Sequence, residues 1–234
     1  MTEPTDRRRM VRPPTSGDPA GRSTAGRLKA AKSHTASSQK WLERQLNDPY
    51  VQRAQAEGWR SRAAFKLLEI DERYHLLRPG VKVIDLGAAP GGWVQVALKQ
   101  GASAVAGVDL LAMDPIHGAD LIQADFTEPG VGDQLMELLG GPPDLVLSDM
   151  AHNTVGHRQT DHLKIVGLIE AAADFALANL KPGGAFVTKT FQGGAAGEVL
   201  AHLKAGFHDV KHVKPKASRS DSSEVYLVAK GRRS

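Results

Sequence analysis

The chain has 234 residues, of which 41% are hydrophobic, so it is long enough to bury the core of one domain of ordinary size. It contains no cysteine, which excludes a disulfide framework and any cysteine-ligated zinc or iron-sulfur site. No apolar run approaches the roughly 20 residues that a membrane-spanning helix needs. We therefore expect a cytoplasmic protein that does not insert into a membrane.

Charge is unevenly distributed along the chain. Residues 1–40 hold 9 Lys and Arg against 3 Asp and Glu, and residues 211–234 hold 7 against 2, which leaves 14 against 21 between them. Each Lys or Arg placed on a phosphate releases condensed counterions, so basic ends on an acidic middle favour a nucleic acid as the partner. Basic tails also promote solubility, and charge alone does not decide between the two interpretations.

The first 39 residues differ in composition from the rest. They are rich in Pro, Gly, Ser, Thr and Arg and have almost no large apolar side chains, so burial cannot offset the entropy of ordering them. We expect a basic, disordered extension at residues 1–39. A single domain at residues 40–230 and a short tail at 231–234 complete the expected organisation.

A helical pattern comes before the first strand. Asn47, Asp48 and Pro49 form a helix start signal, and Ser61 is expected to cap a second helix that carries Phe65. Short β-branched runs then alternate with helical patterns. Strands are predicted at residues 81–86, 104–109, 121–123, 144–148, 185–190, 209–213 and 224–229, and helices at 93–100, 131–139, 161–180 and 196–205. This alternation predicts an α/β fold with a seven-stranded, mostly parallel sheet and helices on both faces.

A turn of small residues, 87–92, directly follows the first predicted strand. Such residues let backbone N–H groups approach a ligand closely. The spacing is not that of a dinucleotide fingerprint, and the Lys-Ser/Thr pair of a P-loop is missing, so a diphosphate is not the expected ligand. Asp109, at the end of the second strand, can accept hydrogen bonds from the two hydroxyls of an adenosine ribose. Asp125, just past the third strand, is placed to meet the base.

This combination resembles the Rossmann-like S-adenosylmethionine-dependent methyltransferases, whose cofactor lies across the ends of the first three strands. Four charged residues, Lys66, Asp149, Lys189 and Glu224, each border an apolar run. A parallel sheet would gather them near the methyl group of such a cofactor. Each element alone is common in proteins, and their order along the chain makes the combination specific.

Five motifs extend the resemblance to the FtsJ/RlmE family of ribosomal RNA 2′-O-methyltransferases. They lie at residues 61–67, 85–93, 148–153, 187–189 and 214–219 with Glu224, and the similarity spans residues 40–230. The family's Lys-Asp-Lys-Glu tetrad falls on Lys66, Asp149, Lys189 and Glu224. The cofactor contacts expected from the resemblance are Gly87, Gly91, Trp93, Asp109, Asp125 and Asp149. One departure is His152, which stands where the family usually has Pro.

The resemblance implies a function as well as a fold. The expected reaction transfers a methyl group from S-adenosylmethionine to the ribose 2′-hydroxyl of a uridine in large-subunit (23S) ribosomal RNA, during ribosome maturation. Lys189 is expected to act as the base and Lys66 to supply positive charge, while Asp149 and Glu224 orient the lysines and the hydroxyl. We expect a monomer that uses no metal. Lys214, Lys216 and Arg219 are expected to hold RNA phosphates.

Several alternatives stay open at this point. Related enzymes that act on transfer RNA or on messenger RNA caps share the tetrad, and a non-catalytic RNA-binding assembly factor could keep the cofactor site. A small-molecule methyltransferase would need an aromatic-lined pocket, and only 5% of the residues are aromatic. A nicotinamide-dependent oxidoreductase would need the glycine spacing that residues 87–92 lack.

Overall fold

The computed structural model describes residues 43, 45–151, 158–191 and 197–234. Residues 48–234 belong to one compact unit, and of the second unit, residues 1–47, only residues 43 and 45–47 are described. The basic extension expected at residues 1–39 therefore lies outside the described residues, and so does His152.

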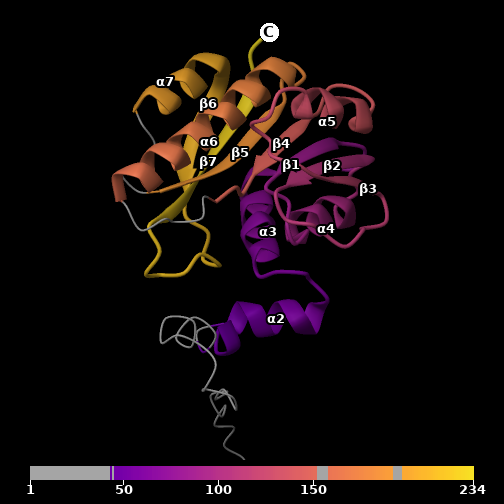
Figure 1. The fold of residues 1–234 in the computed structure, drawn as a ribbon, viewed down its shortest axis with the longest axis vertical. Coiled ribbons are helices and arrows are strands. Elements are labelled where there is room, and N and C mark those ends of the chain that lie inside the picture. The colour runs from indigo at the N-terminus through magenta and orange to yellow at the C-terminus, as the bar shows by residue number, and fades with distance from the viewer. Residues whose placement is uncertain (1–42, 44, 152–157, 192–196) are drawn as a thin grey trace, which may run out of the picture. The chain divides into compact units, whose positions relative to one another are not determined.

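Within the described residues, seven strands form one sheet in the order β3-β2-β1-β4-β5-β7-β6 (Figure 1). The strands are β1 (Lys82–Leu86), β2 (Ala104–Asp109), β3 (Ala119–Gln123), β4 (Leu145–Ser148), β5 (Ala185–Phe191), β6 (Phe207–Val213) and β7 (Glu224–Arg232). The first five strands pair in parallel, whereas β7 lies antiparallel to both β5 and β6. The predicted seven-stranded, mostly parallel sheet is confirmed, and its last strand runs two residues past position 230.

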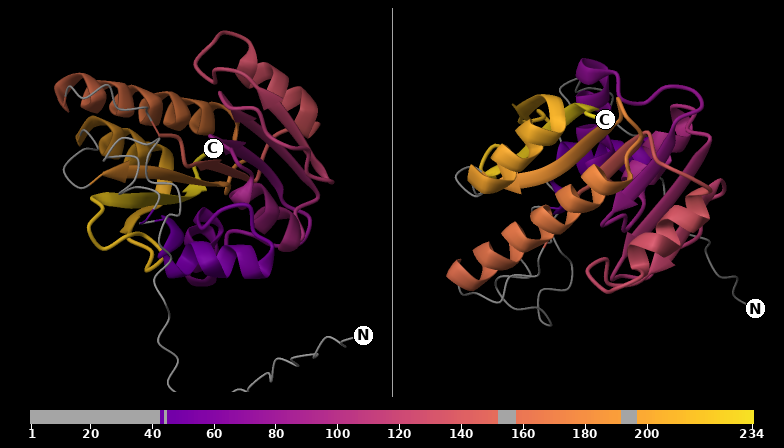
Figure 2. Two further views of the ribbon diagram at one scale, coloured as in Figure 1. Left: turned by 60° about the horizontal axis from the view of Figure 1, so that its bottom comes forward. Right: turned by 90° about the horizontal axis from the view of Figure 1, so that it is seen from above.

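Helices cover both faces of the sheet (Figure 2). Their bounds are α2 (Pro49–Glu57), α3 (Ala63–Tyr74), α4 (Gly92–Lys99), α5 (Val131–Leu139), α6 (Arg158–Asn179) and α7 (Gly197–Gly206). One buried cluster packs α3 and α4 against the sheet, and a second packs α5, α6 and α7 against the opposite face. A parallel sheet needs both layers because its strands are apolar on both sides.

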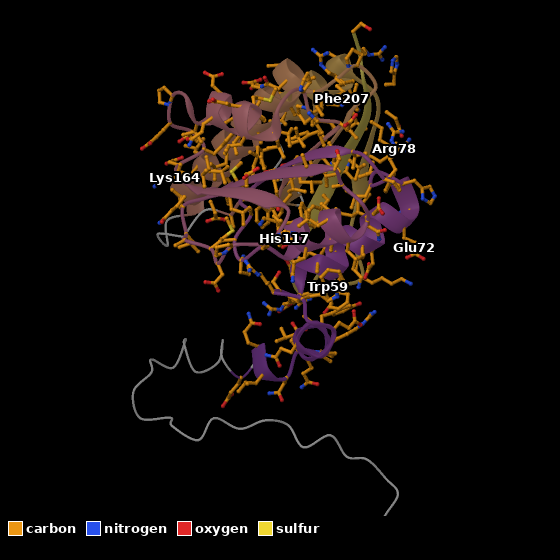
Figure 3. All side chains as sticks on the ribbon, turned by 90° about the vertical axis from the view of Figure 1, so that its right-hand side faces the viewer. Trp59, Glu72, Arg78, His117, Lys164 and Phe207 are labelled. Carbon is orange, nitrogen blue, oxygen red and sulfur yellow. The ribbon has the colours of Figure 1, made fainter. Side chains whose placement is uncertain are left out.

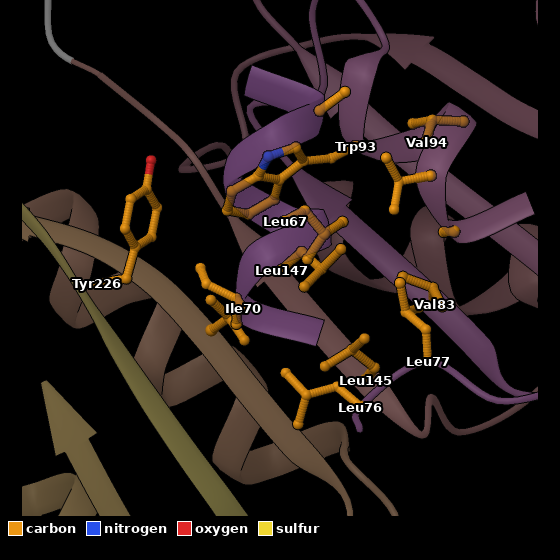
Figure 4. Close-up of a cluster of buried hydrophobic side chains, with 14 of the residues drawn as sticks. Leu67, Ile70, Leu76, Leu77, Val83, Trp93, Val94, Leu145, Leu147 and Tyr226 are labelled. Carbon is orange, nitrogen blue, oxygen red and sulfur yellow. The ribbon is translucent and has the colours of Figure 1, made fainter. Parts of the chain in front are cut away.

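The first cluster shows how the fold holds α3 in place (Figure 4). Leu67 and Ile70 of α3 are fully buried in the same cluster as Leu145 and Leu147 of β4. Burying each such side chain contributes about 2 kcal/mol. Phe207 and Glu72, both labelled in Figure 3, differ in burial, because Phe207 is 1% exposed whereas Glu72 is exposed. No helix among the described residues is long and apolar enough to cross a membrane.

The two predicted helix starts have different outcomes. Asp48 caps α2, because its side chain accepts a hydrogen bond from Tyr50 N at 3.0 Å. The expected cap at Ser61 is wrong: α3 begins after Arg62, and no side chain caps it. The backbone carbonyl of Ser61 accepts from Ala64 N instead, and the Ser61 hydroxyl points at Gly92, where an added Cβ would lie 2.4 Å from it. Close packing against α4 thus sets the direction of this hydroxyl.

Candidate active site

The site lies at the carboxyl edge of the sheet, where three neighbouring strands end together. Leu86 at the end of β1 pairs with Val108 of β2 on one side and with Ser148 of β4 on the other. The residues that follow these strands are consequently neighbours: Ala89 N donates to Oδ2 of Asp109 at 2.9 Å, and Asp149 N donates to Leu86 O at 3.2 Å. Adjacent parallel strands therefore bring the turn at 87–92, Asp109 and Asp149 to one place.

The turn at 87–92 requires glycine at two positions. Gly87 and Gly91 have φ angles of 80° and 106°, in the region that side-chain-bearing residues rarely adopt. A Cβ added at Gly87 would lie 2.8 Å from the backbone of Met150, so this glycine also allows the turn to approach the segment after β4. The resulting cradle keeps the space above the strand ends open.

A pocket of about 240 Å³ occupies that space. Its described lining comprises Gly87, Ala89, Val108, Asp109, Leu110, Leu111, Ala124, Asp125, Phe126, Asp149, Met150, Ala151 and Leu168. Three of these residues are aspartates, and none of the described lining residues is basic. The pocket therefore suits a ligand with apolar surface and positive charge better than one that carries phosphates.

Four of the six residues expected to contact a cofactor line this pocket, namely Gly87, Asp109, Asp125 and Asp149. Gly91 and Trp93 are not among the lining residues. Gly91 precedes α4 as its N-cap, with Ile116 and Arg60 packed over it. The Trp93 ring is buried in the core, where its Nε1 donates to Ala63 O at 2.8 Å.

The four residues of the expected tetrad lie together beside the pocket. Lys66 Nζ lies 2.5 Å from Oε1 of Glu224, and Lys189 Nζ lies 3.1 Å from Oδ1 of Asp149. Lys189 also donates to the backbone carbonyl of Asp149 at 2.6 Å. All four side chains are largely withdrawn from solvent, with exposed fractions between 8% and 18%.

Tyr226 connects the two ion pairs, and the sequence analysis missed it. Its hydroxyl lies 2.9 Å from Asp149 Oδ1, 3.0 Å from Glu224 Oε1 and 3.1 Å from Lys66 Nζ. The Tyr226 hydroxyl can donate a hydrogen bond to only one carboxylate at a time, while its oxygen accepts a hydrogen bond from Lys66. A signal was available, because Tyr226 lies two residues after Glu224 on a predicted strand and must therefore share its face.

Sheet register brings these side chains together. On β5 and β7, Lys189 pairs with Tyr226, and Phe191 pairs with Glu224. Directly opposed and diagonal neighbours across an antiparallel pair are close enough for long side chains to interact. Lys66 reaches the same group from α3, which packs over the sheet in the first core cluster.

The electrostatics of the cluster favour an ionised Asp149 and a protonated Tyr226. Burial opposes ionisation of Asp149, but the positive charges of Lys189 and Lys66 outweigh it and hold the pKa of Asp149 below its usual value. Burial and the negative charges of Asp149 and Glu224 raise the pKa of Tyr226 well above its usual value. Tyr226 therefore stays protonated, and its hydroxyl can donate a hydrogen bond to a carboxylate.

One face of α3 also holds the loop between β6 and β7. Glu69 accepts hydrogen bonds from Lys216 N at 2.5 Å and from Ala217 N at 3.0 Å, and Arg62 donates to Ala217 O. Arg62 and Glu69 flank Lys66 at helical spacing, so the helix that carries this lysine also fixes the loop. Arg219, expected to bind phosphate, lies 3.3 Å from the carboxylate of Asp48. Lys214 and Lys216 expose their side chains.

Within the described ranges, no group of three or more His, Asp or Glu side chains is arranged to hold a metal ion. A sheet of this strand order, opening at its carboxyl edge into an acidic pocket beside two lysines, defines the class of Rossmann-like methyltransferases.

Comparison with known proteins agrees with this class. A sequence model of FtsJ-like methyltransferases matches residues 59–232. The ribosomal RNA large subunit methyltransferase E of Caulobacter vibrioides is 60% identical over 222 residues, which cover 95% of this chain and 98% of the relative. The protein of the same name from Acidiphilium cryptum is 62% identical over 212 residues, which cover 91% and 94% of the two chains.

A solved structure extends the comparison to the fold. A Plasmodium falciparum protein described as a ribosomal RNA methyltransferase is 31% identical, with a TM-score of 0.66, and covers 74% of this chain and 98% of its own. The chain belongs to the FtsJ-like methyltransferase family. The family and enzyme class expected from the sequence are thereby confirmed.

Proposed function

We propose that this enzyme transfers the methyl group of S-adenosylmethionine to the ribose 2′-hydroxyl of a uridine in large-subunit (23S) ribosomal RNA. The names of its bacterial relatives support the ribosomal RNA as substrate. The observation that carries the proposal is the position of Asp149, which lines the acidic pocket and also contacts Lys189, another member of the tetrad. One residue thus joins the proposed cofactor site to the proposed catalytic site.

The charge of the pocket supports the choice of cofactor. S-adenosylmethionine combines an adenosine with a sulfonium and an ammonium group, so three aspartates among the described lining residues complement its positive charge. A diphosphate cofactor would instead face repulsion from the same carboxylates. Gly87 and Met150 both line the pocket, and the missing Cβ of Gly87 lets the turn lie against Met150.

Two aspartates are held in place by backbone groups. Asp109 accepts from Ala89 N through Oδ2 and from Leu111 N through Oδ1, both at 2.9 Å, and each oxygen keeps a lone pair for a ribose hydroxyl. Asp125 accepts from the backbone N and hydroxyl of Thr127 at 2.9 and 2.6 Å. We assign Asp109 to the cofactor ribose and Asp125 to its base.

The bound cofactor supplies an electrophilic methyl group, so the protein must aim a ribose oxygen at it and accept one proton. Lys189 is the proposed base, because its Nζ lies 3.1 Å from Oδ1 of Asp149, a residue that lines the pocket. It must release its own proton before it can accept that of the ribose hydroxyl. Lys66 places positive charge where the ribose oxygen becomes negative. Asp149 and Glu224 hold the two lysines in position through the contacts described above.

The loop between β6 and β7 is the proposed RNA contact nearest to the cluster. Its backbone is anchored by Glu69, and it exposes Lys214 and Lys216. Such lysines bind phosphates without reading sequence. The basic residues 1–39 would add further phosphate contacts to a methyltransferase domain at 40–230, in a monomer that acts in the cytoplasm on the large ribosomal subunit.

The proposal is tested with large ribosomal subunits from cells that lack the protein, incubated with methyl-labelled S-adenosylmethionine. Wild type should methylate one uridine at its 2′-oxygen. Lys189→Ala should bind the cofactor with unchanged Kd and lose at least about 100-fold in rate. Lys211→Ala, which removes an exposed lysine of β6, is the matched control and should retain full activity. Label on a base, or in another RNA, would refute the proposed substrate, and an active Lys189→Ala would refute the proposed base.

A further inference from the structure

One arginine outside the tetrad joins two loops that shape the proposed cofactor pocket. Arg60 lies in the turn between α2 and α3. Its Nη1 donates to Asp114 O at 2.6 Å and to Pro90 O at 3.2 Å, and its Nη2 donates to Pro115 O at 2.8 Å. Pro90 belongs to the turn after β1, whereas Asp114 and Pro115 belong to the loop between β2 and β3. A single guanidinium thus connects the backbones of both loops.

Arg60 is itself held from the other side. Its backbone N donates to Oε1 of Gln95 on α4 at 2.7 Å, and Gln95 Nε2 donates to Gly58 O at 3.1 Å. A Cβ added at Gly91 would lie 3.2 Å from Cδ of Arg60 and 2.6 Å from Cδ1 of Ile116. Both side chains therefore pack directly on the turn after β1.

The loop that Arg60 holds forms one wall of the acidic pocket. Leu110 and Leu111 line that pocket and are 62% and 66% exposed, which is unusual for leucines. At the start of the loop, Leu111 N donates a hydrogen bond to Asp109, the last residue of β2. Farther along the loop, Asp114 O accepts a hydrogen bond from Arg60. The two anchors fix the apolar wall before any ligand enters.

We propose that Arg60 is a positioning residue for cofactor binding, which holds the wall formed by Leu110 and Leu111 at a fixed distance from the turn after β1. This inference rests on the proposed use of S-adenosylmethionine. A wall that is ordered in advance does not have to lose its conformational freedom when the ligand binds, so affinity rises without a direct contact. Arginine suits this role because its planar fork directs several N–H groups at once, whereas lysine offers a single compact ammonium.

The test measures the Kd of S-adenosylhomocysteine by calorimetry, and the KM and kcat of methyl transfer, for wild type, Arg60→Ala and Arg60→Lys. Arg73→Ala is the matched control, since Arg73 is an exposed arginine in the last turn of α3. Arg60→Ala should raise the Kd and the cofactor KM about tenfold. Its kcat at saturating cofactor and its KM for RNA should stay within about twofold of wild type, because among the described residues Arg60 contacts neither the tetrad nor the loop between β6 and β7.

Hydrogen exchange of the free protein gives a second readout that general destabilisation would not reproduce. In Arg60→Ala, the amides of residues 111–118 should exchange faster than in wild type while those of β1 and β4 keep their rates, and saturating S-adenosylhomocysteine should restore protection. Arg60→Lys should resemble Arg60→Ala in affinity. A Kd within twofold of wild type in both variants would overturn the inference. Failure of the wild type to bind S-adenosylhomocysteine would instead overturn the proposed function.

Discussion

Lys66 and Glu224, which are 158 positions apart in sequence, meet at 2.5 Å between Nζ and Oε1. The pair joins α3 to the first residue of β7, and both side chains are nearly withdrawn from solvent. Removing one partner from such a pair leaves the other charge unpaired in a poorly solvated place. The group formed by Lys66, Asp149, Lys189 and Glu224 should therefore be sensitive to substitution at each of its members.

Glu224→Ala should lower both activity and stability. The change removes the carboxylate partner of Lys66 and an acceptor for Ser218 Oγ, which lies 3.2 Å from Glu224 Oε1. We expect the free energy of unfolding to fall by about 3 kcal/mol and kcat by at least tenfold, as is typical when a buried pair is broken. Denaturant unfolding and steady-state kinetics measure the two effects. A wild-type kcat together with a wild-type free energy of unfolding in Glu224→Ala would show that the Lys66–Glu224 pair contributes to neither activity nor stability.

Tyr226→Phe should reduce kcat while leaving cofactor affinity unchanged. The ring, which packs 5.7 Å from that of Trp93, is retained, and only the hydroxyl that joins Asp149, Glu224 and Lys66 is lost. We expect kcat to fall about tenfold and the free energy of unfolding by about 1–2 kcal/mol. Calorimetry with S-adenosylhomocysteine supplies the control. An altered Kd would show that the tyrosine acts in cofactor binding as well.

Asp149→Asn should change how stability depends on pH. The positive charges of Lys189 and Lys66, acting against burial, hold the pKa of Asp149 below its unfolded value, so its stabilising contribution is complete above the unfolded pKa of about 4. That contribution disappears as the pH falls through the lower, folded pKa. The difference in unfolding free energy between wild type and Asp149→Asn should therefore shrink on acidification. A difference that stays constant from pH 7 to pH 3 would contradict this.

Asp85→Asn should have the opposite pH dependence. Asp85 is buried on β1, neither carboxylate oxygen has a partner among the described residues, and burial together with Asp149 and Asp109 raises its pKa well above the usual value. Wild type should lose stability as pH rises from the unfolded pKa of about 4 towards this higher pKa, because ionisation is penalised only in the folded state. The variant cannot ionise, so its stability relative to wild type should increase with pH. If the difference in unfolding free energy between Asp85→Asn and wild type stayed constant from pH 4 to pH 8, Asp85 would not be neutral in the folded protein.

Glu69→Ala should weaken RNA binding without affecting the cofactor. The change releases the backbone of Lys216 and Ala217 from α3. We expect the KM for ribosomal subunits to rise several-fold, with an unchanged Kd for S-adenosylhomocysteine, because an anchored loop binds with less loss of entropy. Glu72→Ala, an exposed glutamate on the same helix, is the control. Equal effects of the two substitutions would show that only net charge matters.

The sequence predicted the alternation of strands and helices because apolar periodicity reports burial on a sheet directly. It also singled out Lys66, Asp149, Lys189 and Glu224, since charged residues at the borders of apolar runs are rare enough to stand out. Tyr226 did not stand out, because a tyrosine in a strand is typical of a core. Its spacing from Glu224 indicates a shared strand face, but its contact with Asp149 follows only from the three-dimensional arrangement.

Contacts between loops were beyond the reach of sequence patterns. The hydrogen bonds of Arg60 end on backbone carbonyls about 30 and 54 positions away, and a carbonyl carries no residue-specific signal. The expected cap at Ser61 failed for a related reason, because packing against Gly92 on α4 overrides a local preference. Trp93 follows a turn that borders the pocket, yet its ring lies in the core, since helix α4 directs it towards Ala63.

The position of β7 has a consequence for the synthesis of this protein. β7 inserts between β5 and β6, and among the described strands β6 pairs with β7 alone, so the sheet cannot be completed until the residues of β7 have been made. Because Glu224 and Tyr226 belong to this strand, a nascent chain that already contains both lysines and the acidic pocket still lacks the groups that align them. Methylation competence should therefore arise abruptly once β7 has been made, rather than gradually as the chain lengthens.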